Sequence, residues 1–340
     1  MRVVRLYGPG DVRLGEEAMP RAGPGDSLVE VAAVGLCGSD LHWYGEAGIG
    51  DARLERPLVL GHEFAGVVRG GPLDGRLVAV DPAIPCGGCQ LCRAGCRNLC
   101  PAVRFAGHGR VDGALREFLT WPTCLLHPLP EEMSAVQGAL LEPLGVALHA
   151  LDLGHLKAGA SVGVFGCGPI GLLLVQLARS VAAGPVIATD PLPHRRRAAL
   201  HSGSDHSWDP SEAAALAGIH SVTGGLGVDV AFEVAGTQAA VDTAVAAVRP
   251  GGRVVLVGIP EDDRTTFEAS LARRKGLTIS LVRRMNDAYP RAIRMVTRKA
   301  VDLDGLVSGR YPLEQAPAAF AAAAARAGLK TVVKPGRPTP

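Results

Sequence analysis

Two groups of residues in this chain have the chemistry of metal ligands, and the first is a cluster of cysteines. The segment contains Cys86-x-x-Cys89-x-x-Cys92 followed by Cys100, so it offers four thiolates at close spacing. Four thiolates that close a tetrahedron are typical of a structural zinc site. Cys96 could compete with Cys100 for the fourth position, and we interpret it as a bystander. The alternative is that these thiols bind no metal.

The second group is dispersed along the chain. Cys37 stands in G-L-C-G-S-D-L-H, His62 and Glu63 in L-G-H-E-F-A-G, and Glu142 in L-E-P-L. A thiolate, an imidazole and one or two carboxylates suit a catalytic zinc ion that keeps an open position for water or substrate. Spacing alone does not establish this set. The alternatives are a structural histidine at position 62 and, at position 142, a carboxylate that stabilises a helix start.

A glycine-rich turn is the third chemical signature. Gly166-Cys-Gly168-Pro-Ile-Gly171 fits G-x-G-x-x-G, with an apolar run before it and an apolar helix expected after it. The first glycine permits a tight turn, the second lets the backbone approach a pyrophosphate, and the third allows close packing of helix on strand. The helix N-terminus offers unpaired N–H donors to the anion. The turn predicts a dinucleotide site, and an ordinary strand–helix turn is the alternative.

Asp190 follows this turn after about 20 residues, at the end of the next expected strand. A carboxylate there accepts hydrogen bonds from the adenosine ribose and repels a 2′-phosphate, which favours NAD over NADP. Arg195, Arg196 and Arg197 leave NADP open, because an arginine at this place can hold that phosphate.

The chain that positions these residues has 340 residues, a length that suggests about two domains. Hydrophobic residues make up 47% and charged residues 20%, as in a globular protein with a core. The 35 basic and 33 acidic residues give a formal net charge of +2, so charge favours neither nucleic acid nor a membrane surface as a partner. The 44 glycines and 25 prolines are not periodic, which excludes a collagen-like chain and predicts many turns.

The pattern of apolar runs changes near residue 150. Before it, short strands such as Ser27–Gly35, Gly66–Val68 and Leu77–Val80 predict a mainly-β unit. After it, strands and helices alternate, which predicts an α/β unit with a doubly wound parallel sheet. The strands expected there are Val162–Phe165, Val186–Thr189, Val228–Val234 and Arg253–Gly258, and the helices are Pro169–Val181, Pro193–His201 and Gln238–Val248. Two further helices are expected over Tyr289–Lys299 and Leu313–Ala327.

The sequence also bears on location. Met1–Leu6 does not begin a signal peptide, and we expect a cytoplasmic protein. Ser161–Ala178 carries no charge, but the glycines in its first half favour a strand, a turn and a helix over a membrane span.

Taken together, these segments resemble the zinc-dependent medium-chain dehydrogenases, in the branch of sorbitol (L-iditol) dehydrogenase and L-threonine 3-dehydrogenase. The resemblance covers nearly the whole chain and rests on G-L-C-G-S-D-L-H-W-Y, L-V-L-G-H-E-F-A-G-V-V, the Cys86–Cys100 lobe, G-A-L-L-E-P-L-G-V-A-L-H-A, the Gly166–Gly171 turn, A-T-D and R-Y-P-L-E-Q-A-P-A-A-F. It implies a central Rossmann domain over 148–282, inserted into a GroES-like catalytic domain. That catalytic domain comprises 1–147, with the structural zinc lobe at 86–100, and the C-terminal return over 283–340.

The resemblance also implies roles for single residues. It places a catalytic zinc ion on Cys37, His62 and Glu63, with Glu142 as a fourth ligand or bound through water, and a structural zinc ion on Cys86, Cys89, Cys92 and Cys100. Ser39 and His42 match the proton-relay positions. The expected NAD contacts are Gly166, Gly168, Pro169, Ile170, Gly171, Asp190 and Arg195, with Val257, Gly258 and Ile259 under the nicotinamide. Arg284 aligns with an arginine near the polyol substrate.

The implied reaction is the reversible, NAD-linked oxidation of a secondary alcohol to a ketone. A zinc ion would lower the cost of the alkoxide as a Lewis acid, and the proton would leave through Ser39 and His42. Polyols such as sorbitol or xylitol lead as substrates, with L-threonine and cyclitols or aminocyclitols as alternatives. Trp43, Tyr44 and Phe105 are candidates for the pocket. A homotetramer or homodimer is implied.

Two departures from the family pattern and two rival functions remain. The stretch Val68–Val80 is shorter than the family's usual loop, and Ser39 stands where threonine dehydrogenases usually carry threonine, which favours a sorbitol-type enzyme. One rival is a zinc-free quinone or enone reductase on the same fold. The other is a binding module built on the zinc lobe, for which near-neutral charge argues against nucleic acid. About two zinc ions per chain would favour the dehydrogenase.

Overall fold

The computed structural model describes residues 1–211 and 213–336 of the chain. Contacts divide the chain into two compact units. The first unit contains residues 1–143, 289–297 and the residues from 303 onward, and the second contains 144–288 and 298–302. Among the described residues, no helix combines the length and the apolar character that a bilayer crossing needs.

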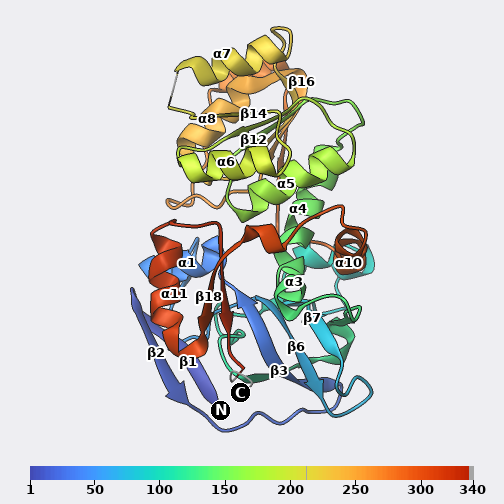
Figure 1. The fold of residues 1–340 in the computed structure, drawn as a ribbon, viewed down its shortest axis with the longest axis vertical. Helices are drawn as coiled ribbons and strands as arrows, with labels where there is room; N and C mark the ends of the chain where they lie inside the picture. Colours follow the sequence, from blue (N-terminus) through green and yellow to red (C-terminus); the bar gives the residue numbers. More distant parts are fainter. Residues whose placement is uncertain (212, 337–340) are drawn as a thin grey trace. The chain divides into compact units, whose positions relative to one another are not determined.

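The first unit is built on a seven-stranded sheet with the order β11-β7-β6-β3-β19-β18, in which β10 also pairs with β3. Its strands are β3 (Asp26–Gly35), β6 (Glu63–Arg69), β7 (Leu77–Val80), β10 (Phe118–Pro122), β11 (Leu126–Pro128), β18 (Val307–Pro312) and β19 (Lys330–Lys334). All pairs are antiparallel except β18 with β19. Figure 1 shows the red C-terminal elements beside the blue N-terminal ones, so segments from both ends of the sequence form one sheet.

Smaller elements complete this unit. The strand pairs are β1 (Arg2–Gly8) with β2 (Asp11–Glu16), β4 (Gly48–Ile49) with β5 (Ala52–Arg53), and β8 (Ala83–Ile84) with β9 (Arg104–Phe105). The helices are α1 (Gly38–Glu46), α2 (Gln90–Arg93), α3 (Ala135–Ala139), α10 (Tyr289–Thr297) and α11 (Ala316–Ala324), and α4 (Leu141–Gly154) begins here. Single 3-10 turns cover Arg97–Leu99, Thr123–Leu125, Asp304–Leu306 and Leu313–Gln315.

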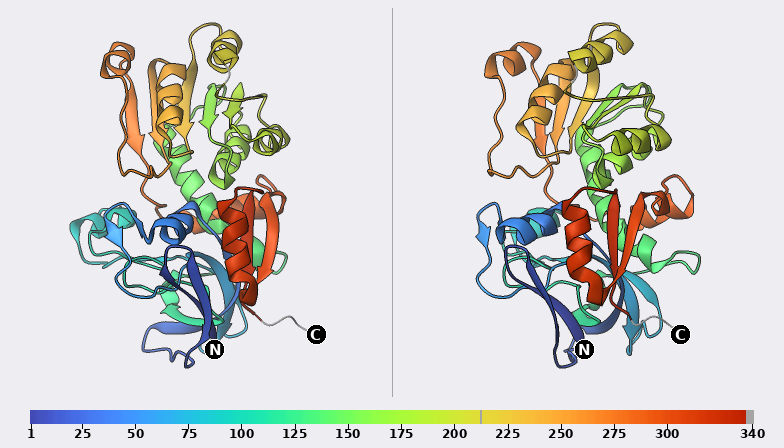
Figure 2. Two further views of the ribbon diagram at one scale, coloured as in Figure 1. Left: turned by 90° about the vertical axis from the view of Figure 1, so that its left-hand side faces the viewer. Right: turned by 60° about the vertical axis from the view of Figure 1, so that its left-hand side comes forward.

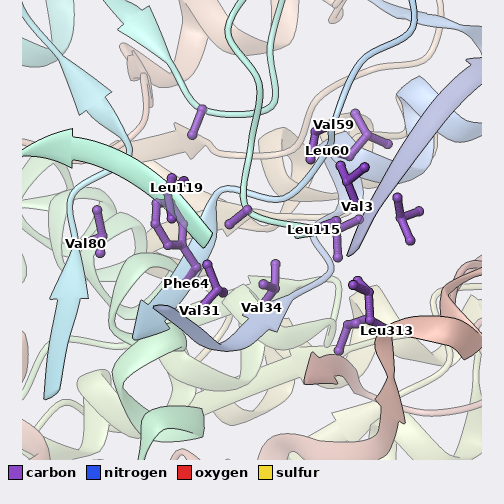
Figure 3. Close-up of a cluster of buried hydrophobic side chains, with 14 of the residues drawn as sticks. Val3, Val31, Val34, Val59, Leu60, Phe64, Val80, Leu115, Leu119 and Leu313 are labelled. Carbon is purple, nitrogen blue, oxygen red and sulfur yellow. The ribbon is translucent and has the colours of Figure 1, made fainter. Parts of the chain in front are cut away.

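Alternation of buried and partly exposed side chains along β3 places one face of the sheet in the core of this unit. Val29, Val31 and Ala33 are fully buried at every second position of β3, as expected for a strand with one face in the core. Figure 3 shows Val31 and Phe64 turned toward Leu119 within the same apolar cluster. Because its flanking residues are anchored in this core, the segment that carries His62 and Glu63 is rigidly placed.

The second unit contains a six-stranded parallel sheet with the order β14-β13-β12-β15-β16-β17. Its strands are β12 (Val162–Phe165), β13 (Val186–Thr189), β14 (His206–Trp208), β15 (Val228–Glu233), β16 (Val248–Leu256) and β17 (Thr278–Leu281). Its helices are α5 (Pro169–Ser180), α6 (Pro193–His201), α7 (Ala213–Val222), α8 (Gln238–Ala247) and α9 (Ala269–Lys275), and helices flank the sheet in both views of Figure 2. This is the doubly wound order of a dinucleotide-binding fold, with its switch point between β12 and β15.

The expected α/β architecture is therefore confirmed, with differences at some element ends. The helix expected over Leu313–Ala327 begins only at Ala316, because Pro317 is tolerated in a first turn and would break a helix interior. The strand expected from Arg253 begins at Val248, where a register shift allows Val248 to pair with Val228. The short connection between β6 and β7 closes as a tight turn in which the amide of Gly75 donates to the carbonyl of Val68 at 2.9 Å.

Candidate active site and metal centres

The four expected cysteines of the lobe converge in the structure. The sulfurs of Cys86, Cys89, Cys92 and Cys100 all lie within 4.8 Å of one another. The Cys86–Cys92 and Cys89–Cys100 sulfur pairs are each 4.0 Å apart. Thiolates at about 2.3 Å from a tetrahedral zinc ion stand about 3.8 Å from each other, so the donor set fits zinc closely. Cys96 is not part of this group and directs its sulfur toward the carbonyl of Ala94.

Backbone amides stabilise thiolates in this lobe. The amide of Cys92 donates to the sulfur of Cys89, and the amide of Cys86 donates to the sulfur of Cys100, each at 3.4 Å. Hydrogen bonds from the amides of Gly88 and Cys89 lower the pKa of Cys86 to about 6. Burial instead raises the pKa of Cys92 to about 12, so in the absence of a cation Cys86 is the sulfur of these two that ionises more easily. Cysteine binds a metal ion as the thiolate.

The second expected group also assembles. Donor atoms of Cys37, His62 and Glu63 lie within 4.8 Å of one another. Strand pairing explains this, because Gly35 at the end of β3 pairs with Glu63 at the start of β6, and Cys37 follows Gly35 by two residues. A Cβ atom at position 35 would lie only 2.0 Å from Oε2 of Glu63, so only glycine leaves room for the carboxylate.

Asp40 orients the histidine of this group. Its carboxylate is fully buried, accepts hydrogen bonds from the amides of Cys37 at 2.9 Å and Gly61 at 3.2 Å, and lies 3.5 Å from Nδ1 of His62. Burial is the largest influence on the pKa of His62 and lowers it, but the charges and hydrogen bonds of Asp40 and Cys37 together raise that pKa well above the usual value. With Nδ1 facing Asp40, Nε2 is the nitrogen left for a metal ion, an arrangement common at metal sites.

Lys330 balances the charge of Glu63. Its ammonium donates to Oε1 of Glu63 at 2.6 Å, lies 2.5 Å from Oε2, and donates to the carbonyl of Leu36 at 2.9 Å. Both side chains are at most 3% exposed. Strand β19 thus delivers a cation to a carboxylate that is 267 residues distant in the sequence.

Glu142 lies outside the group of three donors. It is 4% exposed near the start of α4, and burial raises its pKa to about 7. The group whose donor atoms all lie within 4.8 Å comprises Cys37, His62 and Glu63 without Glu142. Both expected roles of Glu142, a direct fourth ligand and a contact through water, stay predictions.

The two expected relay residues lie on α1, beside the group. The hydroxyl of Ser39 is 3.5 Å from Nε2 of His62. His42 follows three residues later, on the same face of the helix, and its Nδ1 is 3.3 Å from a carboxylate oxygen of Glu46. The ring of Phe105 lies 5.2 Å from that of His62 between centroids, so this expected pocket residue adjoins the site.

Trp43 and Tyr44, the other two candidates for the pocket, pack in the apolar core of the first unit. Trp43 is 2% exposed in the core and meets His108 edge-on. Tyr44 stacks on Phe320 of α11, with ring centroids 5.0 Å apart. In a helix, neighbouring residues point to different faces, and here both aromatic side chains pack inward.

The glycine-rich turn of the second unit has the expected shape. Gly166 has φ +111°, and a Cβ atom there would lie 2.9 Å from the amide nitrogen of Ala235. A Cβ atom at Gly171 would lie 1.9 Å from the carbonyl oxygen of Gly166. At Gly168, which precedes α5, the nearest atom would be a guanidinium nitrogen of Arg195 at 3.8 Å. The turn therefore packs tightly except at its second glycine, where open space lies above the backbone as a pyrophosphate requires.

Asp190 directly follows β13, beside this turn. Its carboxylate accepts hydrogen bonds from the amides of Cys167 at 2.8 Å and Leu192 at 2.9 Å. Nη1 of Arg195 lies 3.9 Å from Oδ2 of the same carboxylate. Arg196 instead donates to Asp209 at 2.8 Å. Arg195 is thus the arginine closest to the position of a ribose phosphate, next to a carboxylate that would repel it.

The remaining expected contacts follow β16 and β17. Val257 and Gly258 are half-buried, and Ile259 is 47% exposed. Arg284 is half-buried and has φ +55°, whereas its neighbour Arg283 is exposed.

Sequence reasoning missed two residues of the first unit. Asp40 lies inside the G-L-C-G-S-D-L-H motif, where an acidic residue three positions after Cys37 at a helix start could have marked it. Lys330 had no local signal, because its role depends on the pairing of β19 with β3.

Comparisons with known proteins agree with this chemistry. Residues 169–298 match the family model described as "Zinc-binding dehydrogenase", and residues 23–131 match "Alcohol dehydrogenase GroES-like domain". The chain is 35% identical to a sorbitol dehydrogenase of Bacillus subtilis (strain 168) over 93% of this chain and 91% of that protein. It is 34% identical to a sorbitol dehydrogenase of Homo sapiens over 97% of this chain and 94% of that protein.

Solved structures are similar over almost the full length. One is a crystal structure from Sinorhizobium meliloti 1021, described as a zinc-binding dehydrogenase bound to NADP. It has a TM-score of 0.90 and 32% sequence identity, and the match covers 98% of this chain and 99% of the other.

Proposed function

Since the chain belongs to the zinc-dependent medium-chain dehydrogenases, in the sorbitol dehydrogenase branch, we propose that it catalyses the reversible, NAD-linked oxidation of a polyol to a ketose. As a member of this family it is an oxidoreductase that acts on CH–OH groups and uses NAD(P) and zinc. The observation that carries the proposal is the grouping of Cys37, His62 and Glu63 around one point, with Asp40 behind the imidazole.

The donor sets suit two different zinc sites. Cys37, His62 and Glu63 would hold a catalytic ion and leave a position open, while the four cysteines of the lobe would close a structural one. When bound in the open site, a zinc ion would supply Lewis-acid stabilisation of negative charge on an alcohol oxygen, and a nicotinamide cofactor would supply the hydride acceptor. Asp40 holds the imidazole in one orientation, and the ion pair with Lys330 holds the carboxylate of Glu63 in place.

Residues of α1 can move the proton of the alcohol. The hydroxyl of Ser39 is close enough to the site to accept this proton, and His42 on the same helix face can pass it toward solvent. Histidine suits this step because its ordinary pKa lies near neutrality. The carboxylate of Glu46 would stabilise the transient imidazolium of His42.

Asp190 supports NAD as the preferred cofactor. Its buried carboxylate is fixed by two amides and would oppose a 2′-phosphate, although Arg195 lies beside it and a similar structure contains NADP. The variant Asp190→Ala tests this by steady-state kinetics with both cofactors. We expect the ratio of kcat/KM for NAD to that for NADP to fall by at least about tenfold. An unchanged ratio would assign the discrimination elsewhere.

Polyols are the substrates best supported, because the curated relatives named above are sorbitol dehydrogenases. The half-buried Arg284 is a candidate for a polyol contact. Absorbance of the reduced cofactor, followed with zinc-loaded protein across polyols, L-threonine and cyclitols, tests the substrate class. Turnover of L-threonine or cyclitols in preference to every polyol would contradict the proposal.

Cys37 provides the test of the metal-dependent mechanism. Cys37→Ser should abolish turnover and lower the zinc content by about one ion per chain, while binding of the reduced cofactor is kept. Cys124→Ser is the matched control, because Cys124 is an exposed thiol outside both donor groups. Turnover by Cys37→Ser at the rate of the control would favour a zinc-free reductase.

We also propose a cytoplasmic location and a homodimer or homotetramer. All eight cysteines are present as thiols, which suits a reducing compartment. Strand β17 is the last strand on one side of its sheet, and its Leu281 is 74% exposed, which supports pairing of this edge with a second copy. Light scattering with Leu281→Lys would test the assembly, and an unchanged mass would exclude this edge as the interface.

A further inference from the structure

Glu233, the last residue of β15, is a buried carboxylate that the proposed reaction does not use. It is 1% exposed. Its Oε1 accepts hydrogen bonds from the amides of Ala235 at 2.8 Å and Gly236 at 2.7 Å. Its backbone carbonyl accepts from the amides of Val257 at 2.8 Å and Gly258 at 3.1 Å. One residue therefore binds the loop that follows its own strand and the loop that follows the neighbouring strand β16.

The two loops touch backbone to backbone at this point. A Cβ atom at Gly258 would lie 2.1 Å from the amide nitrogen of Gly236 and 2.7 Å from Oε2 of Glu233. Gly236 has φ +68°, and a Cβ atom there would lie 2.4 Å from the carbonyl of Ile259. Such contact between two stretches of polar backbone needs a group that accepts their N–H donors, and the carboxylate of Glu233 supplies it.

The position of these loops in the sheet indicates what they face. The glycine-rich turn follows β12, and Asp190 directly follows β13 on one side of it. Strands β15 and β16 lie on the other side of the switch point, where a dinucleotide crosses the carboxyl ends of the strands. If the adenosine half lies at β13, the loops after β15 and β16 face the nicotinamide half.

We propose that Glu233 is a positioning residue that holds these two loops in the shape that receives the nicotinamide half of the cofactor. This inference rests on the proposed use of a nicotinamide cofactor. The pKa of Glu233 is raised by burial, against which the amides of Gly236 and Ala235 act. Burying a carboxyl group costs free energy of desolvation. This cost is explained when the amides that donate hydrogen bonds to the carboxylate belong to loops that form a binding surface.

The conservative variant Glu233→Gln tests the proposal. Glutamine keeps the size of the side chain but replaces one acceptor oxygen by an NH2 group, which would face N–H donors of the loops. Affinities for NADH and for ADP-ribose, which lacks the nicotinamide, are measured by fluorescence and calorimetry. We expect Kd for NADH to rise about tenfold or more while Kd for ADP-ribose stays within about twofold. The KM for NAD should rise with it.

Asp229→Asn is the matched control on the same strand. Asp229 accepts hydrogen bonds from the amide of Ser161 at 2.8 Å and its hydroxyl at 2.7 Å, but it lies near the opposite end of β15. Loss of this carboxylate should lower stability and leave the NADH to ADP-ribose affinity ratio unchanged. The ratio therefore separates positioning from a general loss of stability.

The outcomes are distinct. Equal losses of affinity for both ligands in Glu233→Gln, or no loss for either, would overturn the role of Glu233. If that variant does not fold, Glu233→Asp decides in the same way, because its shorter side chain keeps the charge but withdraws the acceptor oxygen from the amides of Ala235 and Gly236. A wild-type protein that binds neither NADH nor NADPH would instead refute the proposed function.

Discussion

The buried pair of Lys330 and Glu63 allows a quantitative prediction for Lys330→Met. Methionine keeps most of the side-chain volume but removes the ammonium, so the carboxylate of Glu63 loses the cation at 2.5–2.6 Å. Both side chains are at most 3% exposed, and removal of one partner from a buried pair costs about 3–5 kcal/mol. The carbonyl of Leu36 also loses its donor at 2.9 Å, which places the loss toward the upper end.

The assay is urea unfolding followed by tryptophan fluorescence, since Trp43 and Trp121 are buried in the same unit. In chelated protein the full loss is expected, and in zinc-loaded protein a smaller one, because a bound cation would still face Glu63. Adding Glu63→Gln to Lys330→Met should restore most of the stability, since neither member of the pair then leaves an unpaired charge. Stability of chelated Lys330→Met within about 1 kcal/mol of the wild type would refute the reasoning.

Three further predictions concern other parts of the chain. Gly168→Ala should weaken NADH binding at least about tenfold, since its Cβ would occupy the open space above the turn. The free energy of unfolding should fall by less than about 1 kcal/mol. An NADH affinity equal to that of the wild type would contradict pyrophosphate binding at Gly168. Cys89→Ser should lower the zinc content by about one ion per chain, whereas Cys96→Ser keeps it, as metal analysis would show. The pKa of Asp229 is affected most by burial, which raises it, but hydrogen bonds from Ser161 and Arg249 lower it below the usual value. Above its unfolded pKa of about 4, the carboxylate of Asp229 therefore adds to the free energy of unfolding, and this contribution is lost as pH falls through the lower folded pKa. Unfolding curves of Asp229→Asn should lack this acid-dependent contribution.

The parallel sheet was predictable from the sequence because short-range apolar patterns mark its strands. The runs Val162–Phe165 and Val186–Thr189 are strands of that sheet with the expected bounds, since each is a short apolar segment between turn residues. The same holds for Leu77–Val80 in the first unit. The glycine-rich turn was predictable for the same reason. The helix start at Ala316 was missed, although Pro317 gave a local signal for it.

The site in the first unit was predictable only in part. Cys37, His62 and Glu63 were grouped by resemblance, and strand pairing through Gly35 supplies the physical reason that they meet. Lys330 could not be found in this way, because no short-range pattern encodes its contact with Glu63. Glu233 was overlooked for a related reason, since a carboxyl group at a strand end gains meaning only when two loops close around it.

The use of β19 to complete the first unit has a consequence for biosynthesis. Cys37, His62 and Glu63 leave the ribosome early, whereas Lys330 follows only after the whole parallel sheet has been translated. Throughout that interval the nascent carboxylate lacks its ammonium partner, and β3 lacks the neighbour that brings it. All strands of the parallel sheet precede Lys330 in the chain, so we expect the second unit to be able to fold before the proposed metal site of the first unit is complete.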